Sequence, residues 1–551
     1  SPDLTRNDKS KLGPAGGPIS YDQTSVEYYC TIFAFAESPA TRGVLWAGSD
    51  DGLVHVSRDN GTSWQNVTPK DLPEWAMISI IDPSHHDPGT AYVAATRYKL
   101  DDYRPYLYKT TDYGESWTKI TEGIPENSFT RVVRADPASK GLLFAGTETG
   151  LYVSFDDGAQ WQPLQQNLPV CPVHDLVIKH DDLVVGTHGR SFWILDGGVA
   201  VLRQITDQVG GADAHLFTTP VTYRVKGAFR TFFKDQGTTV YNRLGTVNVT
   251  GTRKPDGTLE LLDAGMNPPI GVAVTYFLKS KPEGEVKLRF LDAKGQLIKE
   301  FTSKEAEAPK SGGQGHDSGH GKPKEPKVPA DAGTNRFVWN MRYPDAEDVP
   351  GNMMWRGSVT GPVAAPGSYK VELVVGGQTL AERLEIRKDP RIPATNEELQ
   401  EQFDLLIKVR DKLNETHGAI NQVRHVRGQV DTWVKLAAGH KDADAIAKAA
   451  DELKGRLTAV EEALMQVKSK SHEDPLNFPM QLNNKLATVA DVVAMDDAAP
   501  TKQSYEVFAD LSAKIDGQLD QLRKVLADAV PAFTGLVRDA NLPLIAVAVK
   551  Q

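Results

Sequence analysis

The spacing of hydrophobic residues along the chain changes twice. Up to about residue 205, short β-rich runs alternate with turn residues. Runs of this length, bounded by turns, predict small antiparallel sheets of four strands. The first such unit has runs at 31–36, 44–47, 53–57 and 63–67, and further units cover 77–120, 130–164 and 173–195. From residue 395 the apolar residues recur with helical spacing, which predicts a C-terminal helical domain.

One motif, Ser/Thr-x-Asp-x-Gly-x-x-Trp, occurs three times in the β-rich part, once in each of the first three units. The aspartate of such a turn accepts hydrogen bonds from turn amides, and glycine takes the positive φ angle. The tryptophan is expected to anchor the outgoing strand between neighbouring sheets. Repeats at this spacing predict the blades of a β-propeller over residues 1–205. The repeated residues are Asp59, Gly61 and Trp64, then Asp112, Gly114 and Trp117, then Asp156, Gly158 and Trp161.

This motif resembles the turn of the Asp-box, or bacterial neuraminidase repeat, family. Segments 26–29, 172–176 and 186–196 are similar to the large bacterial proteins described as sortilin-like or glycosyl-hydrolase-like repeat proteins. In that group the propeller repeats precede a β-sandwich and a helical C-terminus. The resemblance therefore implies the same order of domains here. It also implies an extracytoplasmic location, whether periplasmic, cell-surface or secreted.

Four blades can close into a ring, but we expect an open arc here, which would have bare sheet edges and bare apolar faces. The fourth unit ends at Asp196-Gly197 without the tryptophan, as a degenerate last repeat would. The first unit has no such atypical features. We therefore expect further blades, either upstream in the same precursor or on a partner chain.

The remaining sequence divides into three segments. Residues 206–270 are predicted to form a β-rich connection, and 271–392 an immunoglobulin-like β-sandwich with a hairpin turn at Gly376-Gly377. A polar insertion at 304–332 interrupts the sandwich. Its His316, Asp317 and His320 are interpreted as part of a solvated loop, with metal binding as the alternative. Residues 393–551 are predicted to form a helical bundle that opens with a capping box at Thr395-Asn-Glu-Glu398.

Composition excludes some functions. The chain has 551 residues and a formal net charge of −10, which argues against a nucleic-acid-binding protein. Apolar runs are too short to cross a bilayer. Zinc-ligand spacing, a phosphate-binding glycine loop and a Gly-x-Ser-x-Gly motif are absent, so no metal or cofactor is expected. Cys30 and Cys171 enter the first and fourth blades and are expected to remain unpaired.

Blade geometry predicts where a ligand would bind. The repeated turns join third to fourth strands, whereas the starts of first strands and the loops between second and third strands lie at the opposite end. Ligands of propellers bind where such loops converge. The candidate ligand-binding residues are Tyr28, Trp75, Arg97, Arg131, His174, His188 and Arg190. Charged residues predicted at the same end are Glu27, Asp50, Asp51, Glu74, Asp101, Asp102, Arg104 and Glu148.

Two functions fit these residues. The first is a binding protein for a protein, peptide or glycan, with the sandwich and helices as accessory modules. The second is a sialidase-like glycoside hydrolase acting on extracellular glycans, in which Tyr28, Glu27 and several arginines would form the site. Adjacent strand residues point to opposite faces, so Glu27 is poorly placed to activate Tyr28. No catalytic residue is therefore assigned, and binding is the preferred interpretation.

Each candidate also has a purely structural interpretation. Asp50 and Asp51 are typical turn residues. His174 and Asp175 form a plausible structural pair, and His188 with Arg190 is suited to holding a tight glycine-flanked loop.

Overall fold

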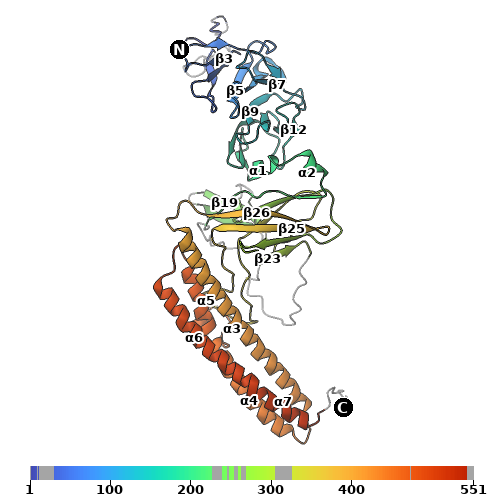
Figure 1. Cartoon of the computed structure of the whole chain (residues 1–551), viewed down its shortest axis with the longest axis vertical. Helices are drawn as coiled ribbons and strands as arrows, with labels where there is room; N and C mark the ends of the chain where they lie inside the picture. Colours follow the sequence, from blue (N-terminus) through green and yellow to red (C-terminus); the bar gives the residue numbers. More distant parts are fainter. Residues whose placement is uncertain are drawn as a thin grey trace. The chain divides into compact units, whose positions relative to one another are not determined.

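The computed structural model describes residues 2–8, 10, 30–225, 239–244, 247–253, 259–261, 268–304, 325–471 and 473–542. The chain is mainly β, with a helical C-terminal region (Figure 1). It divides into two compact units, Ser1–Gly210 and Gly211–Gln551. The predicted residues Glu27, Tyr28, His316, Asp317 and His320 lie outside the described residues.

The first unit consists of successive antiparallel sheets, each with its strands in sequence order. This is the blade arrangement of a β-propeller-type fold. The first sheet contains β1 (Ile32–Glu37), β2 (Leu45–Ser49), β3 (Val54–Ser57) and β4 (Gln65–Asn66), and the second contains β5 (Met77–Pro83), β6 (Ala91–Arg97), β7 (Asp102–Thr110) and β8 (Thr118–Lys119). The third contains β9 (Thr130–Ala135), β10 (Leu143–Thr147), β11 (Leu151–Ser154) and β12 (Gln162–Pro163), and the three-stranded fourth contains β13 (Val173–Lys179), β14 (Asp182–Thr187) and β15 (Phe192–Leu195).

Glycines in the second strands allow neighbouring sheets to approach closely. A Cβ atom added to Gly48 of β2 would lie 2.4 Å from Cγ2 of Ile78 in the next sheet. A Cβ atom on Gly146 of β10 would lie 2.5 Å from Cγ1 of Val173. Close packing between successive sheets therefore requires glycine, which has no side chain, at these positions as well as apolar side chains around them.

The repeated turns have the same hydrogen bonds in each copy. In the second copy, Thr110 Oγ1 donates to Asp112 Oδ1 over 2.7 Å and accepts from Gly114 N over 2.9 Å. Asp112 Oδ1 also accepts from Ser116 N over 2.9 Å, which closes the turn. Asp59 and Asp156 accept in the same way from Ser63 N and Gln160 N, both over 2.8 Å.

The motif tryptophans connect one sheet to the preceding one. Trp117 Nε1 donates to the backbone oxygen of Val67 over 2.6 Å. Trp161 Nε1 donates to the backbone oxygen of Ile120 over 2.8 Å. Both acceptors directly follow the outer strand of the preceding sheet. Each indole therefore fixes the register between two successive sheets while its ring packs in the apolar core.

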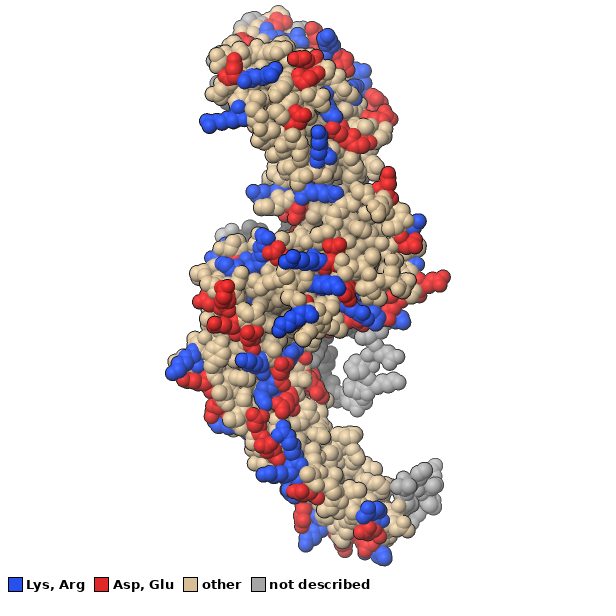
Figure 2. Space-filling model, viewed as in Figure 1, with Lys and Arg blue, Asp and Glu red and all other residues tan. Residues whose placement is uncertain are grey.

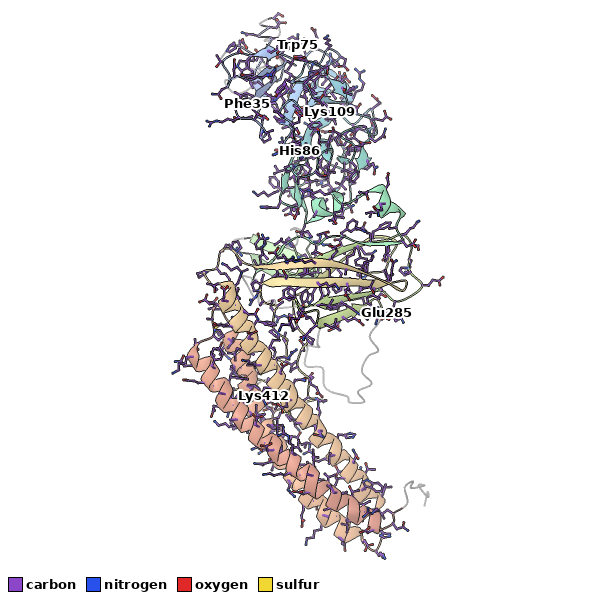
Figure 3. The ribbon with its side chains drawn as sticks, viewed as in Figure 1. Phe35, Trp75, His86, Lys109, Glu285 and Lys412 are labelled. Carbon is purple, nitrogen blue, oxygen red and sulfur yellow. The ribbon has the colours of Figure 1, made fainter. Side chains whose placement is uncertain are left out.

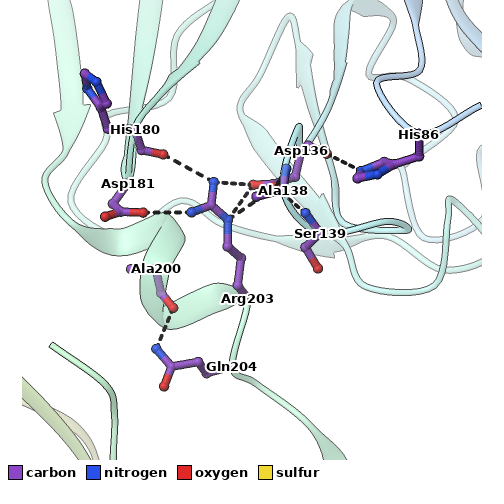
Figure 4. A network of polar contacts seen from close by, with 9 residues as sticks. All are labelled: His86, Asp136, Ala138, Ser139, His180, Asp181, Ala200, Arg203 and Gln204. Carbon is purple, nitrogen blue, oxygen red and sulfur yellow. Dashed lines mark hydrogen bonds and ion pairs between the residues drawn. The ribbon is translucent and has the colours of Figure 1, made fainter. Parts of the chain in front are cut away.

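A buried ionic network joins the third and fourth sheets (Figure 4). Asp136, whose side chain is fully buried, accepts from Arg203 Nε and pairs with Arg203 Nη2, both over 3.0 Å. Arg203 follows the short helix α1 (Gly198–Leu202) and also pairs with Asp181 over 2.7 Å. His86 of the second sheet contacts the backbone oxygen of Asp136 over 3.0 Å. Asp136 thus links parts of three sheets, through its carboxylate to Arg203 and through its backbone oxygen to His86, and the guanidinium compensates the burial of the carboxylate.

The second unit begins with β-sheets that share a hydrophobic core. One sheet has the order β16 (Ala214–Leu216), β21 (Val272–Leu278) and β24 (Gly333–Trp339). The other has the order β17 (Thr222–Arg224), β26 (Gln378–Lys388), β25 (Gly367–Val375), β22 (Lys287–Leu291) and β23 (Leu297–Thr302). A separate sheet contains β18 (Thr239–Leu244), β19 (Val247–Arg253) and β20 (Leu259–Leu261).

Two features of this region bear on the sequence analysis. Strands β16 and β17 fall in the predicted connection 206–270, which also includes helix α2 (Asp207–Gly211), yet both pair with strands of the shared-core sheets. Each of these strands has only three residues, too few to show a strand pattern in the sequence. Their strand conformation depends on pairing with β21 and β26. The hairpin between β25 and β26 turns at Gly376 and Gly377, which have φ angles of 57° and 78°.

The C-terminal helices share one apolar core. They are α3 (Asn396–Leu436), α4 (Ala443–Leu464), α5 (Leu482–Val493), α6 (Lys502–Lys524) and α7 (Val530–Asp539). The capping box is confirmed: Glu398 N donates to Thr395 Oγ1 over 3.2 Å, and Thr395 N donates to Glu398 Oε2 over 2.8 Å. A short π-helix, Val525–Ala529, connects α6 to α7. It directly precedes the turn that contains Pro531, which has no amide hydrogen to donate.

The close packing of the motif glycines generates a first prediction. Gly114 and Gly61 both have positive φ angles, 89° and 83°, so replacing either with alanine costs about 1–2 kcal/mol of unfolding free energy. A Cβ atom on Gly114 would also lie 2.6 Å from Val67 Cβ, whereas the nearest atom to a Cβ on Gly61 is at 3.6 Å. We expect Gly114→Ala to lose about 1–3 kcal/mol more than Gly61→Ala in denaturant unfolding. Equal losses would show that the sheets do not pack as closely as described.

Candidate functional site

The strand pairing separates the two ends of each sheet. In the first sheet Ile32 lies opposite Ser49, and Leu45 lies opposite Ser57. The start of β1 and the β2–β3 connection therefore lie at one end, and the repeated turn after β3 lies at the other. We call the first end the loop face; it comprises residues 30–31, 49–53, 74–76, 97–103, 128–131, 147–150, 171–174 and 187–191.

An aromatic and arginine cluster occupies the loop face of the second and third sheets. The Tyr98 and Phe129 rings stack with centroids 4.9 Å apart, and the Tyr103 ring lies 6.0 Å from Phe129. The Arg131 guanidinium lies 5.1 Å from the Tyr98 centroid and 4.9 Å from that of Phe129. It also pairs with Glu148 over 2.6 Å. We call these five residues the aromatic cluster; cation–π contacts and the ion pair hold it in one arrangement.

Two histidines continue the same surface on the fourth sheet. The rings of His174 and His188 stack with centroids 4.9 Å apart, and both residues are exposed. Partial desolvation of the ring, together with the positive charge of Arg131, lowers the pKa of His174. His174 is therefore mainly neutral at physiological pH and able to accept a hydrogen bond from a ligand. The sequence predicted a pairing of His174 with Asp175. In the structure the Asp175 carboxylate binds Arg134 over 2.9 Å, and His174 stacks on His188.

On the second sheet Arg97 is held by its neighbours. Its Nε donates to the backbone oxygen of Glu74 over 3.0 Å, and its Nη1 lies 3.4 Å from Asp102 Oδ2. Asp102 is buried and also binds Arg104 over 2.8 Å and the Tyr106 hydroxyl over 2.7 Å. The hydrogen bonds from Arg104 hold the pKa of Asp102 well below its usual range. Arg97 is thus positioned by a carboxylate that stays ionised.

Trp75 lies at the first-sheet edge of the loop face with an unusual backbone. Its φ angle is 65°, and that of Asp101 on the same face is 57°. A positive φ is uncommon for a bulky residue and stores about 1–3 kcal/mol of strain. The Arg6 guanidinium lies 5.6 Å from the Trp75 ring (Trp75 is labelled in Figure 3). Such strain clusters at functional sites, although positive φ angles also occur at Asn60, Tyr113 and Asp157 in the repeated turns.

Asp50 and Asp51 hold backbone, as their structural interpretation expects. Asp50 Oδ1 accepts from the amides of Cys30 and Thr31, each over 2.9 Å. Asp51 Oδ2 accepts from Arg6 N over 2.6 Å. Burial raises the pKa of Asp50, but its oxygens are occupied by these donors. Both carboxylates connect segments of the chain and are not presented to a ligand.

The structure thus places six of the seven candidate residues on the loop face. Arg131 belongs to the aromatic cluster, His174 and His188 continue its surface, and Arg97 adjoins it through Tyr98. Arg190 is exposed, with Nη1 donating to Gly189 O over 3.1 Å, and its loop is closed by Trp193 Nε1 donating to Arg190 O over 2.8 Å. Tyr28 lies outside the described residues.

Sequence reasoning missed Tyr98, Tyr103 and Phe129. Tyr98 belongs to a 3-10 turn, η2 (Tyr98–Leu100), and Phe129 directly precedes β9. A signal was present, because these aromatic residues lie in the same connections that supplied Arg97 and Arg131.

A concave region lies along the first strands of the first two sheets. A cleft of about 350 Å³ is lined by β1 and β5 residues together with His85 and Arg134. Asp82 within it accepts from Ala135 N over 2.7 Å and pairs with Arg134 over 3.2 Å. Burial raises the pKa of Asp82. Because these bonds join the second and third sheets, we assign Asp82 a structural role.

Other kinds of site are not supported in the described part of the chain. No group of three or more His, Cys, Asp or Glu side chains there could hold a metal ion. None of the helices described is long and apolar enough to cross a membrane. Both cysteines are free thiols, with Cys171 buried and Cys30 partly so. Acidic and basic side chains are interspersed over the surface seen in Figure 2.

Comparison with known proteins gives limited likeness. No protein-family model matches the chain, and no curated protein matches it either. Among solved structures, YCF48 from Cyanidioschyzon merolae is similar at 17% identity and a TM-score of 0.25, over 45% of this chain and 80% of that one. A GH74 xyloglucanase from Xanthomonas campestris is similar at 12% identity and a TM-score of 0.25, over 64% of this chain and 54% of that one. A YCF48 bound to a D1 peptide gives 16% identity and a TM-score of 0.23, over 44% and 75%. These likenesses are too low to transfer a function.

The buried carboxylate on the loop face yields a pH-dependent prediction. Because the pKa of Asp102 is lower in the folded chain, its ionised form stabilises the fold above its ordinary pKa of about 4, and this stabilisation is lost as pH falls further. We expect Asp102→Asn to lower the free energy of unfolding most at neutral pH. The difference from the unaltered chain should shrink below about pH 4 in denaturant titrations. A difference that is independent of pH would refute this account of Asp102.

Proposed function

We propose that this chain is the binding part of an extracytoplasmic Asp-box propeller protein. Its ligand is a protein or peptide segment, or a glycan, held on the loop face. The sheets and helices of Gly211–Gln551, which we interpret as an immunoglobulin-like sandwich and a helical bundle, serve as accessory or assembly modules. The resemblance of the repeated turns to the Asp-box supports this class, and the proposed location follows from the same resemblance.

The observation that carries this proposal is the aromatic cluster and its continuation through His174 and His188. Tyr103 is 49% exposed, although its ring lies against the buried ring of Phe129. A preorganised aromatic surface loses little conformational entropy when a ligand stacks on it. Arg131 of this cluster and Arg190 on the same face supply donors, and His174 supplies an acceptor, for orienting a polar ligand.

Binding fits the described carboxylates better than hydrolysis does. A glycoside hydrolase needs a carboxylic acid that donates a proton and a second carboxylate near it. On the loop face, Glu148 is paired with Arg131, Asp102 with Arg104, and the oxygens of Asp50 and Asp51 bind backbone amides. These groups are held in structural bonds, and so we favour binding. The sialidase-like hydrolase remains the second hypothesis, with its carboxylates on blades beyond these residues.

The proposal predicts that Tyr103→Ala weakens ligand binding at least tenfold, about 1.4 kcal/mol, because the exposed ring is lost from the surface. The probes are a panel of neutral and acidic oligosaccharides and a displayed library of random peptides, each tested against the intact chain. Dissociation constants of the best binder from each panel are then measured by calorimetry for the variants.

The matched control is Glu115→Gln, an exposed substitution in a repeated turn at the opposite end of the second sheet. It should leave affinity unchanged. Binding that survives Tyr103→Ala but is lost in Glu115→Gln would contradict the assignment of the loop face. An oligosaccharide that is cleaved on incubation would favour the hydrolase instead.

A further inference from the structure

One side of the first sheet differs from the corresponding side of the other sheets. Strand pairing makes four residues of the first strands equivalent, since Phe35 pairs with Ala47 as Ile81 pairs with Val93, Val133 with Ala145 and Leu176 with Val185. Three of these residues are buried, with exposures of 4% for Ile81 and 0% for both Val133 and Leu176. Phe35 is 62% exposed (Figure 3). The Phe35 side chain is therefore exposed at a position where the other three sheets have a buried aliphatic side chain.

The direction in which these residues point follows from their neighbours. Gly48 is on the opposite side of its sheet from Phe35 and faces Ile78 and Ile81 of the second sheet. Val133 shares a core with Tyr92 and Leu107 of the preceding sheet. The equivalent residues thus face backward, each toward the preceding sheet. Phe35 faces away from the second sheet, toward the place where a preceding sheet would lie.

Among the described residues of the first sheet, two buried polar atoms at positions that would face a preceding sheet lack partners; a third, Trp46 Nε1, belongs to the opposite side of that sheet, where Trp46 pairs with Ala36. Trp117 and Trp161 bind backbone oxygens of the preceding sheets, but Trp64 Nε1 is buried without a hydrogen-bond partner. His55 pairs with Ala47 on the Phe35 side, and its Nδ1 is also buried without a partner. Buried unpaired donors and acceptors are uncommon and require an explanation. Here the position of the absent acceptor is known from the other two copies of the motif.

The motif glycines give a third, independent sign. A Cβ on Gly114 would meet Val67 at 2.6 Å, and one on Gly158 would meet Ile120 at 2.7 Å, in both cases on the preceding sheet. A Cβ on Gly61 would meet Leu45 of its own sheet at 3.6 Å. Position 61 is therefore a glycine, as close approach of a preceding sheet would require, although no described sheet lies against it. We call Phe35, His55, Gly61 and Trp64 the leading face.

We infer that the leading face is a docking surface for a further four-stranded blade of the same repeat type, which supplies a backbone carbonyl after its outer strand to Trp64 Nε1. The same blade would cover Phe35 with apolar residues of its second and third strands, as Gly48 and its neighbours cover Ile81. This interface continues one that is repeated between the described sheets. The inference does not depend on which ligand the loop face binds.

The fourth sheet of a second copy of this chain cannot act as such a blade. The fourth sheet is three-stranded in the described residues, so it lacks the outer strand that precedes Val67 and Ile120 in the other sheets. It does expose apolar residues, with Phe192 80% and Ile194 58% exposed, where the equivalent Leu151 and Val153 are almost fully buried. The occupant is therefore a complete blade, and self-association is an alternative that the test must distinguish.

The test adds such a blade to the full chain. A copy of residues 77–129 is inserted directly before Thr31, so that its outer strand and connection enter β1 as they enter β9. Hydroxyl-radical labelling, quantified by mass spectrometry, reports the exposure of Phe35, with Val133 as the internal standard for a buried residue. In the unaltered chain Phe35 should be labelled far more than Val133. In the extended chain its labelling should fall to near that of Val133.

The control is the same extended chain carrying Gly61→Ala, which blocks close approach and should restore labelling of Phe35. Labelling that is unchanged by the added blade would overturn the proposal. Sedimentation of the unaltered chain over a range of concentrations decides the alternative. A dimer in which Phe35 becomes protected would show that a second copy covers the leading face and would also overturn it.

Discussion

The first unit depends on one repeated interaction, the hydrogen bond from a motif tryptophan to the backbone of the preceding sheet. Small sheets have two apolar faces and cannot bury both alone, so each requires a neighbour on either side. The indole of Trp117 or Trp161 provides apolar area and a directional bond in one side chain. The aspartate and glycine of the same turn place that indole. The motif is therefore a device for stacking sheets in a fixed register.

This device explains why structure and proposed function lie at opposite ends of the sheets. The repeated turns are committed to packing, and their aspartates bind their own turn amides. The connections at the other end are free to vary, and there Tyr98, Phe129 and Arg131 form an ordered surface. A rigid stack of sheets holds these loops in place, which is the arrangement that propeller-type folds offer for ligand binding.

The sequence was sufficient to predict the features set by local patterns. Repeated turns, strand spacing, the hairpin at Gly376-Gly377 and the capping box at Thr395 all depend on residues close together in the chain. It was insufficient for β16 and β17, whose strand character comes from partners far away in sequence. The loop face could be located from blade geometry. The stacking of Tyr98 on Phe129 could not be predicted, because it requires the conformation of two separate loops.

The measurement that tests this account most directly is the hydrogen exchange of indole N–H groups in the 551-residue chain, followed by NMR with selectively labelled tryptophan. The account predicts that Trp117 and Trp161 exchange slowly and resonate at positions typical of hydrogen-bonded indoles. Trp64, whose Nε1 has no partner in the described structure, should resonate apart from them and exchange faster. Three indoles that behave alike would contradict it, because the tryptophan link would then not be what joins one sheet to the preceding one.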